Sequence, residues 1–389
     1  MPQFINHHIF HGHKKLQYTE MNELYISLSL RALALGVGGL FVPLFLYDIG
    51  YSLVMIAVFY LVSMTMRVPI EIVAAKTINR IGAKHTLTIS YSSLFMYFVT
   101  LYLLPYFPWL WPITAFFLAV EMALFWVSYH LQVSSVRSKD KASSQVGMTM
   151  ILRRIFMALG PLIGGVVATT YGVEYTLLLA AALLTAASYP LFKTPDMHKS
   201  TPFKVRDIKL TLGKDSVAHL AWQLSGIAAT FLWPLWMFFV LGDYTQIGLI
   251  IALSIVFGIG LTLWVGRLGD KGHNDGLLKI GSGIKATSHV LRPLSMSFPI
   301  AFIANLFNDL GDNFAQGPFI EKFYEAADEG ERFMYVLRMN IMSAIGKALA
   351  WVLLLVLALM LTQTAALQSL FILAALSMPA IVWVSARTS

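Results

Sequence analysis

Glu121 is the residue best placed to do chemistry, because it is a single carboxyl group in the middle of an apolar run over residues 118–126. A carboxyl group in such surroundings can take up and release protons near neutral pH. Its expected partner is Arg31 or Arg153, each of which lies in another apolar segment. The pattern predicts either a proton carrier or an ion pair that only stabilises the fold.

Arginines inside apolar segments also suggest binding of an anion. A guanidinium group binds a carboxylate or a phosphate through two hydrogen bonds, and Arg31 and Arg153 are the candidates. Arg31 could instead extend to the lipid headgroups or pair within the protein. Arg153 and Arg154 point about 100° apart on a helix, so at most one of them faces the interior. Arg67 and Glu71 lie four residues apart, which predicts an ion pair on one helix face.

A polar stripe runs through the otherwise apolar residues 296–320. Its members recur every three or four residues, as one face of a helix requires. Such a stripe predicts a hydrated cavity or a hydrogen-bonded cluster, and the expected partners of its two acids are Arg338 and Lys347. The stripe consists of Asn305, Asn308, Asp309, Asp312, Asn313 and Gln316.

Other chemistries have no support in the sequence. The chain has no cysteine, which excludes disulfides and thiolate metal ligands. It contains no P-loop motif and no pairing of a nucleophile with a base. We therefore expect no enzyme activity, no metal site and no cofactor.

The composition indicates that these residues lie in a membrane protein. Hydrophobic residues make up 57% of the chain and charged residues only 12%, with a mean hydropathy of +0.69. Soluble domains carry about 25% charged residues. The net charge of +8 is spread over short clusters between apolar segments, which argues against a nucleic-acid partner and favours a lipid bilayer.

The apolar segments predict an all-α protein with twelve transmembrane helices, each of about 20 residues. The ninth contains Lys279, Lys285, His289 and Arg292, so a short or broken helix is an alternative there. The predicted spans are 23–48, 51–76, 84–106, 109–133, 145–170, 173–193, 217–241, 246–266, 277–293, 296–320, 333–361 and 364–386.

The basic residues predict the orientation of these helices. Most of the 28 lysines and arginines fall in the tail, the linker or alternate connections, which the positive-inside rule places in the cytoplasm. Both termini are then cytoplasmic, and we expect a monomer in a prokaryotic cytoplasmic (inner) membrane. Residues 1–21 form a cytoplasmic tail, 22–193 an N-terminal six-helix bundle, 194–216 a cytoplasmic linker and 217–389 a C-terminal six-helix bundle.

The two predicted bundles repeat each other at an offset of 191 residues, which aligns Asn79 with Asp270 and Glu121 with Asp312. Internal repeats of this kind occur in transporters whose halves rock about a central site. The aligned loops carry a short motif of glycine, acidic and basic residues, and the second copy is the more complete. The copies contain Asn79, Arg80 and Gly82, then Gly266, Asp270, Lys271 and Gly272.

This loop motif resembles the signature of the major facilitator superfamily. The resemblance implies two pseudo-symmetric six-helix bundles and a gating role for the loops. The fifth predicted helix also resembles a pattern associated with antiporters in that family, in which Pro161 bends the helix. Small residues at this spacing equally allow ordinary close helix packing. The pattern consists of Gly147, Gly160, Pro161, Gly164 and Gly165.

The leading hypothesis is a secondary transporter that moves a small-molecule solute by alternating access. Protons are the expected coupling ion, and the helix pattern slightly favours export of a small organic compound. Import of a small organic anion is the alternative, because of Arg31 and Arg153. An alternative of another class is a non-transporting membrane sensor or lipid scramblase of the same fold.

Overall fold

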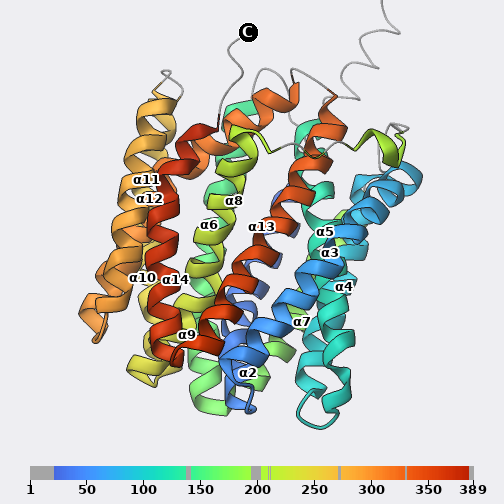
Figure 1. Ribbon diagram of the computed structural model, residues 1–389. Helices are drawn as coiled ribbons and strands as arrows, with labels where there is room; N and C mark the ends of the chain where they lie inside the picture. Colours follow the sequence, from blue (N-terminus) through green and yellow to red (C-terminus); the bar gives the residue numbers. More distant parts are fainter. Residues whose placement is uncertain are drawn as a thin grey trace, which may run out of the picture.

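The structure is a computed structural model that describes residues 22–136, 142–193, 203–208, 210, 212–269, 273–328 and 331–384. The described residues are almost entirely helical, and their long helices run side by side in one bundle (Figure 1). The predicted tail over residues 1–21 lies outside the described residues, as does much of the predicted linker. The all-α prediction is confirmed.

The first half of the chain forms six helical passes. The first pass is a helix over residues 22–37 that turns at Gly38 and continues to Asp48. The other elements are η1 (Gly39–Phe41), α2 (Val42–Asp48), α3 (Leu53–Ile81), α4 (Ala83–Leu103), α5 (Trp111–Val136), α6 (Ala142–Tyr171) and α7 (Val173–Ser188), followed by η4 (Tyr189–Phe192).

The second half also forms six passes. Its first pass consists of α8 (Lys214–Ile227), the π turn η6 (Ala228–Leu232) and α9 (Trp233–Leu241). Pro234 is the second residue of α9, which directly follows the π turn, so the irregular turn lies where the proline has no N–H to donate. The other passes are α10 (Tyr244–Gly269), α11 (Asn274–Leu291), α12 (Phe298–Asp328), α13 (Arg332–Met360) and α14 (Gln363–Ser377), which continues into η8 (Met378–Trp383).

Corresponding helices begin at the spacing that the repeat predicts. Leu53 begins α3 and Tyr244 begins α10, which is 191 residues later. Ala83 and Asn274, which begin α4 and α11, are separated by the same interval. The structure therefore has the two related six-helix bundles expected from the sequence.

Ten passes are long and apolar enough to cross a bilayer by themselves. The remaining two described passes are α11 and α12, which carry the lysine, the histidine and the polar stripe that weakened the sequence pattern. Both are continuous helices, so the ninth predicted span is not broken. Their polar residues face each other, and Figure 1 places the pair together along one side of the bundle.

The glycines of the fifth predicted helix let neighbouring helices approach closely. A methyl group added at Gly160 would lie 2.6 Å from the Cα atom of Gly36, on the first helix. A methyl group at Gly165 would lie 2.7 Å from the carbonyl oxygen of Tyr244, at the start of α10. Helix packing therefore explains Gly160, Gly164 and Gly165 without a signature for antiport.

Aromatic residues join the two halves at the end of the bundle where α2 and α9 lie. The rings of Tyr47 and Phe239 have centroids 4.8 Å apart, and the hydroxyl of Tyr244 donates a hydrogen bond to Asp48. Nearer the middle, Tyr60 stacks on Trp351 with centroids 4.5 Å apart. These contacts close one end of the interface between the halves.

Candidate functional site

A cavity of about 460 Å³ lies between the two halves. Side chains of the first helix, α3 and α5 line it on one side, and side chains of α8, α12 and α13 line it on the other. Its size lies within the range of small-molecule sites. This space, here called the central cavity, is lined by three of the buried charged residues of the described first half, Arg31, Arg67 and Glu121.

The clearest charged feature of the central cavity is the ion pair between Arg31 and Glu121. Nη2 of Arg31, on the first helix, donates a hydrogen bond to Oε1 of Glu121, on α5. The guanidinium carbon lies 3.4 Å from the centroid of the Phe125 ring, so the pair is held against an aromatic face. Both side chains are almost fully buried. Of the two predicted partners of Glu121, the structure selects Arg31, and the side chain of Arg153 lies outside the described part.

A second ion pair lies on α3. Nε of Arg67 donates a hydrogen bond to Oε1 of Glu71 over 2.7 Å, as their spacing of four residues predicts. Arg67 lines the central cavity, and both side chains are buried. The pair fixes a cation at the cavity wall.

Lys347 is the third cation in the wall of the central cavity, whereas the sequence led us to expect it beside the acids of the polar stripe. It lies on the same face of α13 as Asn340 and Ser343, which also line the cavity. Within the described ranges, no hydrogen bond or ion pair reaches its ammonium group. Together with Arg31 and Arg67 it outnumbers the carboxylates of Glu71 and Glu121, so the formal charge around the cavity is positive.

Aromatic rings form much of the remaining wall. Trp222 stacks on Phe319 with centroids 4.7 Å apart on the side of the second half. Trp126 and His130 stack with centroids 5.8 Å apart on the side of the first half. Nδ1 of His130 also makes a 3.0 Å hydrogen bond to the Tyr324 hydroxyl, across the interface between the halves. A bound solute therefore meets aromatic faces on both sides.

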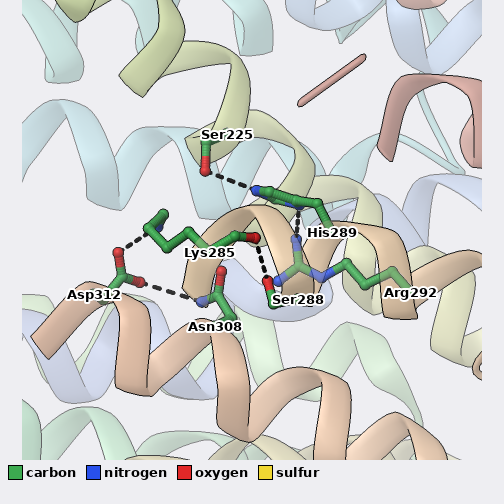
Figure 2. A network of polar contacts seen from close by, with 7 residues as sticks. All are labelled: Ser225, Lys285, Ser288, His289, Arg292, Asn308 and Asp312. Carbon is green, nitrogen blue, oxygen red and sulfur yellow. Dashed lines mark hydrogen bonds and ion pairs between the residues drawn. The ribbon is translucent and has the colours of Figure 1, made fainter. Parts of the chain in front are cut away.

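A separate polar cluster joins α8, α11 and α12, and none of the residues drawn in Figure 2 lines the central cavity. Lys285 donates a hydrogen bond to Asp312, and the amide of Asn308 donates another over 3.2 Å. Arg292 donates to Nδ1 of His289 over 2.9 Å. Because arginine can only donate, Nδ1 carries no proton, and Nε2 of His289 donates to Ser225 over 2.8 Å. We call this the α11–α12 cluster.

The α11–α12 cluster contains two members of the polar stripe, Asn308 and Asp312. Of its six members only Gln316 lines the central cavity. Asn305 is buried outside the cavity wall, and one buried oxygen of Asp309 has no hydrogen-bond partner in the described part of the chain. Most of the stripe therefore lies outside the wall of the central cavity.

The acids of the stripe have a different partner from the one expected. We predicted Arg338 and Lys347 from α13, but Asp312 pairs with Lys285 from α11. Arg338 instead donates a hydrogen bond over 3.2 Å to the carbonyl of Asp207. Asp312 is the repeat equivalent of Glu121, so the same position carries a paired acid in both halves.

The first loop motif forms the tight turn between α3 and α4. Gly82 has a φ of 89°, which strongly favours glycine, and Asn79 and Arg80 lie in the last turn of α3. In the second copy Gly266 lies near the end of α10. Asp270, Lys271 and Gly272 lie outside the described residues, and Gly147 is described only as part of α6.

Comparison with known proteins agrees with this architecture. Residues 11–176 match the family model described as the MFS_1 like family. No curated protein matches the chain in sequence. Among solved structures, a crystal structure of a variant of the E. coli fucose:proton symporter has a similar fold, with a TM-score of 0.64 at 10% identity over 96% of this chain and 98% of that one. The first half of the chain therefore resembles the major facilitator superfamily in sequence, and both halves together share the fold of this solved symporter.

Proposed function

We propose that this protein moves a small solute through the central cavity by alternating access, and that protons drive the movement. The observation that carries the proposal is the buried Arg31–Glu121 ion pair in the wall of a cavity between two repeated bundles. Ionisable residues inside a membrane are costly, and they usually mark pathways for ions or substrates. The symporter of similar fold couples a sugar to protons, which agrees with the proposal.

Alternating access requires contacts between the halves that form and break. At the α2 and α9 end these contacts are the packing of the Tyr47 ring against the Phe239 ring and the hydrogen bond from Tyr244 to Asp48. On the cavity wall the hydrogen bond between His130 and Tyr324 also crosses the interface. A rocking motion that separates one set and preserves the other opens the central cavity to one side at a time.

Glu121 is the proposed proton carrier. While it is ionised, its charge holds the Arg31 guanidinium against the cavity wall. Protonation removes that charge, and Arg31 becomes free to interact with a solute. Proton binding and solute binding are thereby coupled through one side chain.

Flux measurements in proteoliposomes test this function without knowledge of the solute. Vesicles that contain a pH-sensitive dye receive the small-molecule fraction of a cell extract, and the protein is expected to change the internal pH. Acidification on solute entry indicates symport, whereas alkalinisation indicates the antiport that export requires. A sensor without transport activity gives no signal.

Variants locate the proton step. Glu121→Gln should abolish the pH change while solute exchange continues, because the neutral amide keeps the shape of the side chain but carries no titratable proton. Glu325→Gln is the matched control, since Glu325 is exposed and lies outside the cavity wall. An unchanged pH signal in Glu121→Gln would rule out Glu121 as the carrier.

Cytoplasmic termini remain a prediction from the basic residues. Protease protection of tagged termini checks this orientation.

A further inference from the structure

We propose that the transported solute carries an anionic group, such as a carboxylate, and that Lys347 binds that group. This inference rests on the proposed transport function and names the chemical class of its substrate. The two can fail separately, because a neutral solute would still move with protons.

Lys347 is available for a ligand in a way that the other cavity cations are not. Arg31 is bonded to Glu121 and Arg67 is bonded to Glu71. For Lys347, no hydrogen bond or ion pair is formed anywhere in the part of the chain that the structure describes. Its side chain is partly buried and lines the central cavity. A buried charge without a partner is unfavourable, so an anion in the cavity gains the full attraction of this ammonium group.

The charges around Lys347 also favour an anion. The ones that act on it are Arg67, Glu71 and Glu121. Because Arg67 and Glu71 neutralise each other, and Glu121 is bonded to Arg31, the excess positive charge of the cavity lies on Lys347. Protonation of Glu121 makes the cavity more positive and strengthens the binding of an anion. Proton and anion therefore bind cooperatively.

The position of Lys347 links the anion to closure of the halves. Lys347 belongs to α13 in the second half, and Arg31 and Arg67 belong to the first half. When Glu121 is protonated, Arg31 loses its counter-charge, and Arg31 and Lys347 then repel each other as the walls approach. An anion between them replaces repulsion with attraction, and so stabilises the closed arrangement that must form during each transport cycle.

The rest of the wall indicates an apolar or aromatic body for the solute. Trp222 and Phe319 present a stacked pair on one side, and Trp126 lies on the other. Beside them, Asn340 and the hydrogen-bonded pair of Gln223 and Ser343, 3.3 Å apart, offer neutral polar groups. An organic monocarboxylate with a flat apolar body fits this combination of walls.

Thermal unfolding of the purified full-length protein tests the anion class. The probes are benzoate, phenylacetate, indole-3-acetate and octanoate, each compared with its uncharged amide. Small-molecule pools from a cell extract, retained or not retained by an anion exchanger, extend the test beyond these compounds. We expect carboxylates or the retained pool to raise the melting temperature of the wild-type protein, and the amides and the unretained pool to leave it unchanged.

Variants assign the effect to Lys347. Lys347→Gln should weaken binding on the order of 10- to 100-fold, the effect of losing a hydrogen bond to a charged group, whereas Lys347→Arg should retain most of it. Lys279→Gln is the control, because Lys279 is exposed and lies away from the cavity. Melting of each variant without ligand shows whether it is folded.

Three results would overturn the proposal: equal shifts by the amides or the unretained pool, an unchanged shift in Lys347→Gln, or no shift by any carboxylate or by the retained pool. A pH signal in the flux assay alongside any of these would leave proton-coupled transport standing and reject only the anionic solute. A shift without any pH signal would reject the proton coupling instead.

Discussion

The ion pair between Lys285 and Asp312 allows a quantitative test of whether the α11–α12 cluster stabilises the fold. The Lys285 side chain is 4% exposed and that of Asp312 is 27% exposed. Asp312→Asn removes the negative charge but keeps the shape of the side chain. Its amide oxygen can still accept the hydrogen bond that Asn308 donates. The substitution therefore isolates the charge of Asp312 from its packing.

The expected cost follows from the burial of the two partners. Removal of one member of a fully buried ion pair costs about 3–5 kcal/mol, because the other charge loses its compensation. The Asp312 side chain is only partly buried, and the hydrogen bond from Asn308 remains after the substitution. We therefore expect Asp312→Asn to lower the free energy of unfolding by about 2 kcal/mol. Adding Lys285→Gln should recover part of this loss, since no charge is then left unpaired.

Unfolding of the protein in mixed detergent micelles, titrated with SDS, measures these free energies. Asp275→Asn is a matched control, because Lys322 and Asp275 form an ion pair between the same two helices with Asp275 76% exposed. That pair should contribute less than about 1 kcal/mol. Equal losses in Asp312→Asn and Asp275→Asn would refute the reasoning. Additive losses for Asp312→Asn and Lys285→Gln would refute it as well.

Two further predictions concern the contacts between helices. Gly160→Ala should destabilise the protein by roughly 1–3 kcal/mol in the same unfolding assay, because the added methyl group meets the backbone of the first helix. The control is Gly283→Ala, at a helical position in open space, which should be neutral or stabilising by up to about 1 kcal/mol. Tyr244→Phe removes the hydrogen bond to Asp48 and should favour opening of that end by about 1 kcal/mol, or about fivefold. Because the chain has no cysteine, maleimide labelling of a single Ser343→Cys on the cavity wall reports this opening, and an unchanged labelling rate would contradict the prediction.

Features that depend on position along one helix could be predicted from the sequence. The helical passes and the pair between Arg67 and Glu71 follow from spacing within one helix, and the repeat follows from a constant offset along the sequence. The pair between Arg31 and Glu121 was predicted only as one of two options, because it joins two helices. Its selection depends on how each helix is rotated about its axis, and hydropathy leaves that rotation open.

The partners of the polar stripe were misassigned for the same reason. Arg338 and Lys347 were both expected to reach the acids of α12. The two positions are nine residues apart, and side chains at that spacing on a helix point about 180° apart. The two side chains therefore point to opposite faces, and at most one could have met α12. Lys285 lies on α11, the helix that precedes α12, but it was not considered as a partner because it belongs to the weakest predicted span.

The repeat places an acidic residue at the same position in both halves, and the two residues have different partners. Glu121 receives its arginine from the first helix and stays in the cavity wall, whereas Asp312 receives its lysine from α11 and lies in a cluster beside the cavity. The base of each pair thus comes from a non-equivalent helix. Under the proposed function, the pair in one half carries the proton and the pair in the other half stabilises the fold, and the difference follows from which neighbouring helix supplies the positive charge.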